Sequence, residues 1–234
     1  MTNRKKPHNR YRLHTPARRV VTPSGGIVRG KFPSLKNNRM VRYEGLIEAD
    51  AVISFELNPA IIHYREQPYK VKYPRDGKLR TYTPDFELLL SNGETLLVEI
   101  KHSEFMRRLE NKTKYQVIAD WLQFERTDYT IITEQELRVE PRLGNLRYIY
   151  RQLSKKRYTR TRLQIILSSL NEYEKTTVGR LNIAVAKYQL TAFDFLVAGL
   201  ISCCLDEKIS NSTALIRLEE NDNGWFYICK KYGF

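Results

Sequence analysis

The spacing of apolar residues predicts an α/β order in the first half of the chain. Apolar positions are dense between residues 41 and 57, which favours a helix packed against a sheet, and Asn58-Pro59 ends it. The later elements are extended segments at 61–65, 69–73, 81–90 and 95–101, a helix at 104–125 and a short buried strand at 129–133. We therefore expect an α/β unit with a single sheet flanked by helices.

The pattern becomes mainly helical after a break at about residues 138–143. Helices are predicted at 145–157, 160–175 and 178–188, and a capping-box-like start at Thr191 and Asp194 precedes the apolar helix "AFDFLVAGLISCCL". Two strand-like runs, "TALIRLEE" and "WFYICKK", follow and are joined by "NDNG". This order predicts a winged-helix-like domain at 141–234, after an extended basic arm at 1–38 and an α/β domain at 39–140.

The stretch "TPDFELLLSNGETLLVEIKHSEF", Thr83 to Phe105, reads as a buried β-hairpin with three charges in it. A two-residue loop at Asn92-Gly93 would place charged and apolar side chains together on each face of the hairpin. A three-residue loop with a left-handed Gly93 instead pairs Phe86 with Val98 and gives one clean apolar face. We expect this second register.

The same register places Asp85, Glu99 and Lys101 together on the other face of the hairpin. Two carboxylates at one point repel each other unless a cation lies between them. Carboxylate oxygens and the backbone carbonyl of Ile100 suit Mg²⁺, with Mn²⁺ as a substitute. A metal-bound water with Lys101 beside it predicts metal-assisted hydrolysis of a phosphodiester.

Positive charge is segregated along the chain, whose net charge is +14. Residues 1–42 hold 12 Lys or Arg and residues 141–171 hold eight, with no Asp or Glu in either segment. Such segments indicate binding to the phosphates of double-stranded DNA. A solubilising tail and a solvated helix face remain the alternatives. The predicted DNA contacts are Arg18, Arg19, Lys31, Lys36, Gln67, His102, Lys155, Lys156 and Arg157; for Gln67 a sheet-edge hydrogen bond is the alternative.

Several classes of protein are disfavoured by composition. No run approaches 18 consecutive apolar residues, and the basic N-terminus lacks the apolar block of a secretory signal. The three cysteines build no disulfide framework, and the four histidines show no zinc-binding spacing. We expect a soluble, cytoplasmic protein without a membrane partner.

The hairpin "TPDF…LLVEIK" resembles the core of PD-(D/E)xK nucleases. The resemblance implies a restriction-endonuclease-like mixed sheet flanked by helices and a bacterial, nucleoid-associated protein. The longer series "GLIEADAVISFELNPAIIHYREQP", "RTYTPDFELLL", "VEIK" and "YTIITEQEL" resembles the N-terminal catalytic domain of TnsA-type transposon endonucleases, over roughly residues 40–137. The resemblance implies a metal-binding glutamate on the first helix, which matches Glu48, with Glu44 as the alternative and Glu56 as a second glutamate eight residues on. Glu99 stands where the best-known member has a glutamine.

The resemblance implies the endonuclease subunit of a heteromeric transposase that cuts the 5′ ends of a transposon. Its implied partners are a DDE-type transposase subunit, which cuts and joins the 3′ ends, and an AAA+ ATPase regulator. Beyond residue 140 the match is architectural only. Two alternatives remain, which are a stand-alone nuclease of restriction, repair or junction resolution, and a non-catalytic DNA-binding regulator.

Overall fold

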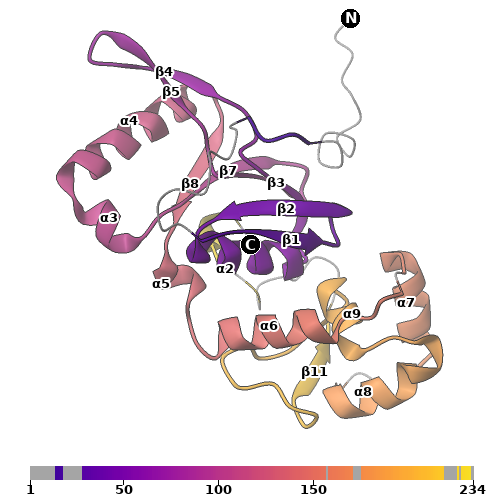
Figure 1. Ribbon diagram of the computed structural model, residues 1–234. Coiled ribbons are helices and arrows are strands. Elements are labelled where there is room, and N and C mark those ends of the chain that lie inside the picture. The colour runs from indigo at the N-terminus through magenta and orange to yellow at the C-terminus, as the bar shows by residue number, and fades with distance from the viewer. Residues whose placement is uncertain are drawn as a thin grey trace, which may run out of the picture. The chain divides into compact units, whose positions relative to one another are not determined.

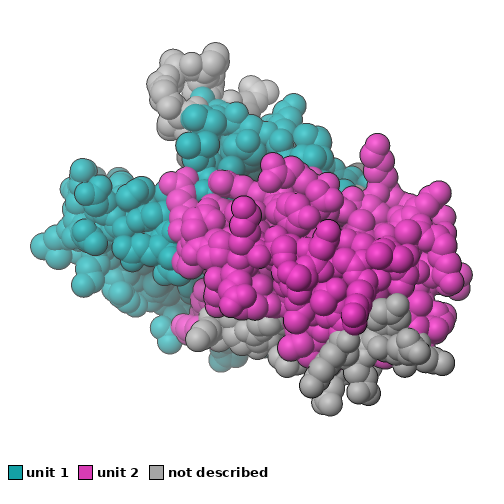
Figure 2. All heavy atoms as spheres, turned by 90° about the horizontal axis from the view of Figure 1, so that it is seen from below, with its two compact units in different colours: residues 1–56, 61–137 teal, residues 57–60, 138–234 magenta. Residues whose placement is uncertain are grey.

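The structure is a computed structural model that describes residues 14–17, 28–156, 158–170, 175–218, 226 and 228–232. The chain divides into two compact units, residues 1–56 with 61–137 and residues 57–60 with 138–234, which are coloured separately in Figure 2. Each unit is described by itself below. Over these described ranges, no helix has the length and apolar character to cross a membrane.

A four-stranded mixed sheet forms the centre of the first unit (Figure 1). Its order is β3 (Ile61–Glu66), β6 (Phe86–Leu90), β7 (Thr95–Ile100) and β8 (Asp128–Ile132). The first three strands are antiparallel, and β8 runs parallel to β7 because the chain crosses over through helices between them. The expected mixed sheet is confirmed.

The register of the β6–β7 hairpin follows the three-residue loop. Phe86 pairs with Val98 and Leu88 pairs with Leu96. Gly93 has φ 88°, a conformation that glycine adopts without strain, and its N–H donates to the carbonyl of Leu90 at 3.0 Å. The expected register is therefore confirmed. Glu99, the charged residue of β7, points away from the face that carries Phe86.

Helices cover both faces of this sheet. The ring of Phe55 on α2 (Leu46–Leu57) packs against Phe86, with centroids 5.5 Å apart. On the opposite face, Tyr115, Ile118 and Leu122 of α4 (Leu109–Phe124) pack with Leu97. Burial on both faces explains why β6 is apolar at every position except Glu87, which forms a buried ion pair with Arg65.

The start of the first unit differs from the expectation. The helix expected from residue 41 begins only at Leu46, because residues 39–44 form β2 (Arg39–Glu44), which pairs with β1 (Arg29–Ser34). Gly45, with φ 132°, makes the transition from β2 to α2. The last part of the expected basic arm is thus a strand and a turn, not a free extension. In β2, the apolar side chain of Val41 is fully buried.

Two further elements are divided. The helix expected at 104–125 breaks at Arg108, whose ψ of 127° is extended, into α3 (Ser103–Arg107) and α4. The strand expected at 81–90 breaks at Thr83-Pro84-Asp85, because proline has no N–H for a ladder and disfavours regular structure before it. Residues before the break form a separate hairpin, β4 (Val71–Arg75) with β5 (Lys78–Tyr82). The unit ends with α5 (Glu134–Leu137).

The second unit begins with two helices, α6 (Arg142–Gln152) and α7 (Arg160–Ser168). They are followed by α8 (Val178–Val185), the short 3-10 helix η1 (Ala186–Tyr188) and α9 (Ala192–Val197). The predicted capping box at Thr191 and Asp194 is confirmed. The helix after it is shorter than predicted, because the chain turns at Gly199, with φ 67°, into β10 (Ile201–Ser202).

The C-terminal hairpin is the main correction in the second unit. Strand β11 (Ala214–Arg217) lies between β10 and β9 (Lys175–Thr177) and is antiparallel to both. The expected partner at 225–231 is not a strand in its described residues, which include the 3-10 helix η3 (Lys230–Tyr232). The expected "NDNG" turn lies outside the described residues. A local turn signal predicted pairing between neighbours, whereas β11 pairs with segments farther back in the chain.

Candidate active site

Asp85 lies at the end of the Thr83-Pro84 break, where β6 is about to begin. Its Oδ2 accepts hydrogen bonds from the backbone N–H of Ile100 at 2.9 Å and from the Lys101 Nζ at 3.0 Å. Its own carbonyl accepts from the N–H of Gln67 at 2.7 Å. The carboxylate is therefore fixed at the end of β7 by Ile100 and Lys101, and the backbone of Asp85 is fixed by Gln67.

The ammonium group of Lys101 is surrounded by oxygen atoms. Besides Asp85, it contacts Oε1 of Glu99 at 2.7 Å and the carbonyl of Ile100 at 3.0 Å. Burial alone would lower the pKa of Lys101, but the charges of Asp85 and Glu99 raise it well above its usual value. The lysine is therefore held as a cation at this point.

Glu99 is almost fully buried, with 3% of its surface exposed. The hydroxyl of Tyr82 donates to its Oε2 at 2.5 Å and that of Tyr115 donates to its Oε1 at 2.8 Å. Burial raises the pKa of Glu99, and the charge of Asp85 adds to the rise, whereas Lys101 lowers it. The tyrosines and the lysine thus engage both oxygens of this carboxylate.

The two tyrosines were not among the predicted site residues, although one signal could have found them. Tyr115 lies on the same apolar face of α4 as Ile118 and Leu122, at helical spacing. A buried tyrosine hydroxyl needs a hydrogen-bond partner. Such a residue on a core face therefore indicates a buried acceptor, which here is Glu99.

Glu48 lies in the first turn of α2, and its Oε2 accepts the backbone N–H of Glu44 at 2.7 Å. Burial and the nearby charge of Asp85 raise the pKa of Glu48 to about 8. The fold therefore brings Glu48 within electrostatic reach of Asp85. Glu44 contributes a backbone donor that fixes the carboxylate of Glu48.

A small pocket joins these acidic residues. Its lining is Pro16, Arg42, Tyr43, Glu44, Glu48, Glu66, Gln67 and Asp85. Gln67 has φ 42° and makes the sheet-edge backbone bond to Asp85 given above. Its side-chain oxygen is buried, and it has no hydrogen-bond partner among the described residues. The sheet-edge alternative for Gln67 is thus present, and a DNA contact stays a prediction.

Lys36 is not placed as a DNA contact, which corrects the prediction. Its Nζ donates to the backbone carbonyls of Phe55 at 2.9 Å and Ile61 at 2.6 Å. Burial lowers the pKa of Lys36 to about 7, and the negative charge of Glu56 offsets only part of this decrease. The amino group faces the interior and cannot at the same time reach a phosphate.

Glu56 is equally structural. It accepts hydrogen bonds from the Ser34 hydroxyl at 2.7 Å, the Tyr64 hydroxyl at 2.7 Å and the Leu35 N–H at 2.6 Å. It holds the turn after β1 and does not join Asp85.

The remaining predicted DNA contacts are spread over the chain. Lys31 is exposed on β1, and Lys155 and Lys156 are exposed in the turn after α6, where Lys156 lies 5.2 Å from the centre of the Tyr158 ring. Arg18, Arg19 and Arg157 lie outside the described residues. Exposure is compatible with a DNA contact for the three lysines, and that contact stays a prediction.

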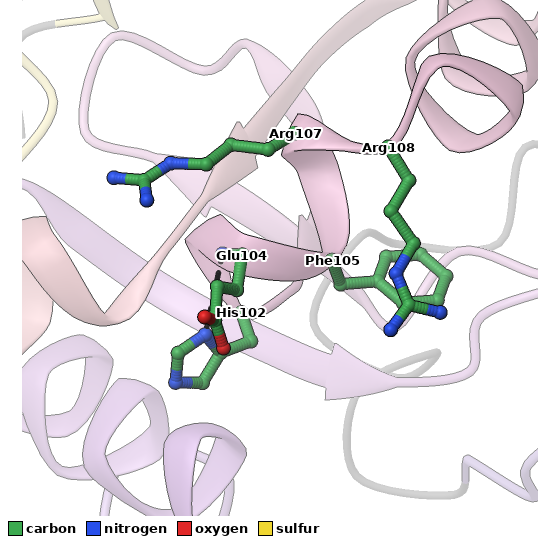
Figure 3. Close-up of a pocket in the computed structure, with 5 residues that line it drawn as sticks. All are labelled: His102, Glu104, Phe105, Arg107 and Arg108. Atoms are coloured by element: carbon green, nitrogen blue, oxygen red, sulfur yellow. Dashed lines mark hydrogen bonds between the residues drawn. The ribbon is translucent and has the colours of Figure 1, made fainter.

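His102 caps α3 by accepting the N–H of Glu104, and its Nδ1 lies 3.6 Å from a carboxylate oxygen of Glu134. It lines an open pocket of about 460 Å³ with Glu104, Phe105, Arg107 and Arg108 (Figure 3). In this view the two arginine side chains leave α3 in different directions. The pocket therefore has cationic walls, but its guanidinium groups do not converge on one point.

No group of three or more His, Cys, Asp or Glu side chains is close enough to hold a metal in the part of the chain that the structure describes. Two residues that line the small pocket nevertheless each have one carboxylate oxygen without a hydrogen-bond donor among the described residues. Oδ1 of Asp85 and Oε1 of Glu48 accept no hydrogen bond from described residues. With the Ile100 carbonyl they form an oxygen-only donor set, which fits a hard divalent cation.

Residues 58–134 match the family model described as the TnsA-like endonuclease N-terminal domain. The matched range includes Asp85, Glu99 and Lys101 and begins after Glu48. A comparison with curated proteins finds no significant match. The match confirms the resemblance inferred from "TPDF…LLVEIK", and the geometry at Asp85 and Lys101 lies within it. The chain therefore carries a TnsA-like endonuclease domain of the PD-(D/E)xK superfamily.

Proposed function

We propose that this protein is the metal-dependent DNA endonuclease subunit of a heteromeric transposase, which hydrolyses the phosphodiester at the 5′ ends of a transposon. The proposal rests on one observation. Asp85, the Ile100 carbonyl and Lys101 meet at the adjacent ends of β6 and β7, and Glu48 lies within electrostatic reach of Asp85. Asp85, Ile100 and Lys101 lie inside the matched TnsA-like endonuclease domain, and Glu48 precedes it. The chemistry of this arrangement suits a negatively charged diester.

Asp85, Glu48 and the Ile100 carbonyl would hold Mg²⁺ or Mn²⁺. The proximity of Asp85 helps to raise the pKa of Glu48, and a cation between the two carboxylates would offset their repulsion. When bound, the metal supplies Lewis-acid stabilisation of the phosphate and a water of lowered pKa. Glu48 must release its proton before it can serve as a ligand, because a carboxylate binds metal in its ionised form.

Glu99 was predicted as a metal ligand, but its contacts favour a different role. Both its oxygens are engaged by Tyr82, Tyr115 and Lys101. We propose that Glu99 holds the ammonium of Lys101 in place while the tyrosines hold Glu99. A carboxylate with these donors serves the reaction by positioning the lysine.

Lys101 then acts on the substrate. Its ammonium donates hydrogen bonds to the attacking water or to a phosphate oxygen on which charge develops. Mutagenesis of comparable charge-stabilising donors typically costs ~10²–10³ in turnover. The charges of Asp85 and Glu99 raise the pKa of Lys101 and favour its charged form for this role.

The second unit is proposed to be a winged helix. The order α7, β9, α8, α9, β10, β11, with the last strand in the middle of its sheet, supports this topology. Helix α9 contains no Lys or Arg, and Ala192, Phe193, Phe195 and Leu196 are buried. DNA contact by this unit would therefore rest on Lys155 and Lys156 rather than on α9. A surface for the proposed AAA+ regulator is the other role that we assign to the unit.

The proposal is tested by nicking of a supercoiled plasmid that carries the ends of the element. Wild type and Asp85→Ala are each assayed alone and with the DDE-type subunit, in Mg²⁺, Mn²⁺ or EDTA. We expect metal-dependent cuts at the 5′ strand ends only in the wild-type mixture. Cleavage by the protein alone would indicate a stand-alone nuclease. Absence of cleavage in every mixture that binds the DNA would indicate a non-catalytic regulator.

A further inference from the structure

Hairpin β4–β5 is a two-stranded ribbon that lies outside the four-stranded sheet (Figure 1). Its strands pair without interruption from Val71 with Tyr82 to Arg75 with Lys78. The turn residues Asp76 and Gly77 both have positive φ, 53° and 68°, as a tight two-residue hairpin turn requires. The ribbon is therefore a regular element and not a loop.

The base of the ribbon is anchored at the active site. Tyr73 and Tyr82 are buried in the cluster that includes Tyr115 of α4. The hydroxyl of Tyr82 also bonds Glu99, which in turn holds Lys101. One end of the ribbon is thus connected to Lys101 through the hydrogen bond from Tyr82 to Glu99 and the ion pair between Glu99 and Lys101.

The rest of the ribbon is exposed and basic. Four exposed cations have no ion-pair partner among the described residues: Lys70, Lys72, Lys78 and Arg80. Asp76, the one acid between residues 69 and 82, lies 3.5 Å from Arg75 instead. Among these charges Leu79 is 72% exposed, and it pairs with the exposed Pro74.

We propose that this ribbon is a binding element for duplex DNA beside the active site. A two-stranded ribbon fits the major groove, where lysine and arginine side chains reach the phosphates on either side. Leu79 and Pro74 provide an apolar contact to base edges or sugars. The inference rests on the proposed DNA substrate and adds the element that aligns the duplex with Lys101.

The test is binding of a fluorescein-labelled duplex of random sequence to the full chain, followed by anisotropy. EDTA and an Asp85→Ala background remove cleavage from the measurement. Lys78→Gln/Arg80→Gln is compared with Lys112→Gln/Arg126→Gln, which removes two exposed cations of α4 and its C-terminal end. The urea midpoint of each variant establishes that folding is unchanged.

We expect the hairpin pair to lower the slope of log affinity against log salt by about 1.8, since each phosphate contact contributes about 0.9. At about 0.1 M salt this corresponds to roughly eightfold weaker binding for each lost contact. The control pair should leave the slope within about 0.5 of the parent value.

Equal losses in the two pairs would reduce the effect to net charge and overturn the proposal. Unchanged binding by the hairpin pair would also overturn it, and the four cations would then serve to keep the ribbon edges from pairing with another chain. Either result leaves the nuclease proposal intact, because plasmid nicking tests that proposal separately.

Discussion

Glu56 and Glu99 are both buried glutamates that accept a tyrosine hydroxyl, yet their surroundings differ. Glu56 accepts from two backbone N–H groups of a turn and from Ser34, so its donors belong to the scaffold. Glu99 accepts from the ammonium of Lys101, which also contacts Asp85 at the sheet edge. The donors of a buried carboxylate, more than its burial, therefore distinguish a structural role from a catalytic one.

The nearby lysines show the same contrast. The amino group of Lys36 faces two carbonyls, and burial lowers its pKa to about 7. Lys101 is also removed from water, but two carboxylates more than offset burial and raise its pKa. A carbonyl offers only a dipole, whereas a carboxylate offers a full charge. Lys101 consequently remains a cation at neutral pH.

The largest expected effect separates the two glutamates directly. Glu56→Ala leaves four donors without their acceptor and should lower the free energy of unfolding by on the order of 3–5 kcal/mol. Glu99→Ala should cost roughly half as much, because Lys101 keeps Asp85 as a partner, but should slow cleavage ~100-fold or more. Urea denaturation and plasmid nicking measure the two quantities. A Glu99→Ala variant that unfolds as readily as Glu56→Ala would make Glu99 structural.

The tyrosine donors give a smaller and matched comparison. Tyr115→Phe and Tyr64→Phe each remove one hydroxyl bonded to a buried glutamate, at 2.8 and 2.7 Å. Each should lower the free energy of unfolding by about 1–2 kcal/mol. Only Tyr115→Phe should slow cleavage, by roughly tenfold, because only Glu99 positions a catalytic group. Equal cleavage rates for the two variants would remove Tyr115 from the site.

The smallest expected effect concerns Glu48 and depends on pH. Its folded pKa of about 8 lies above the ordinary value of 4.5, so the native state retains a proton that the unfolded state releases. Stability from this group is therefore complete below pH 4.5 and is lost as pH rises to about 8. In EDTA, Glu48→Gln should remove this pH dependence, so that the stability of the variant relative to wild type rises between pH 5 and pH 8. The exposed Glu125→Gln serves as the control, and identical pH profiles of the two variants would contradict the raised pKa of Glu48.

The contacts around the site could be predicted only in part. The loop length and the alternation of side chains in "TPDFELLLSNGETLLVEIK" were sufficient to place Asp85, Glu99 and Lys101 on one face. Successive side chains of a strand point to opposite faces. That Glu99 faces two tyrosines could not be read in the same way. Tyr82 belongs to another hairpin and Tyr115 to a helix, and their approach depends on packing across the sheet face.

The sequence by itself determined the mixed α/β core, the hairpin register and the endonuclease resemblance, since these follow from local periodicity and short-range spacing. The tertiary structure decided the rest. It turned Lys36 inward, divided the strand before Asp85 to form the basic ribbon, and paired β11 with β9 rather than with a later segment. These outcomes depend on contacts between segments that are far apart in the chain, and a pattern within one segment carries no information about its partner.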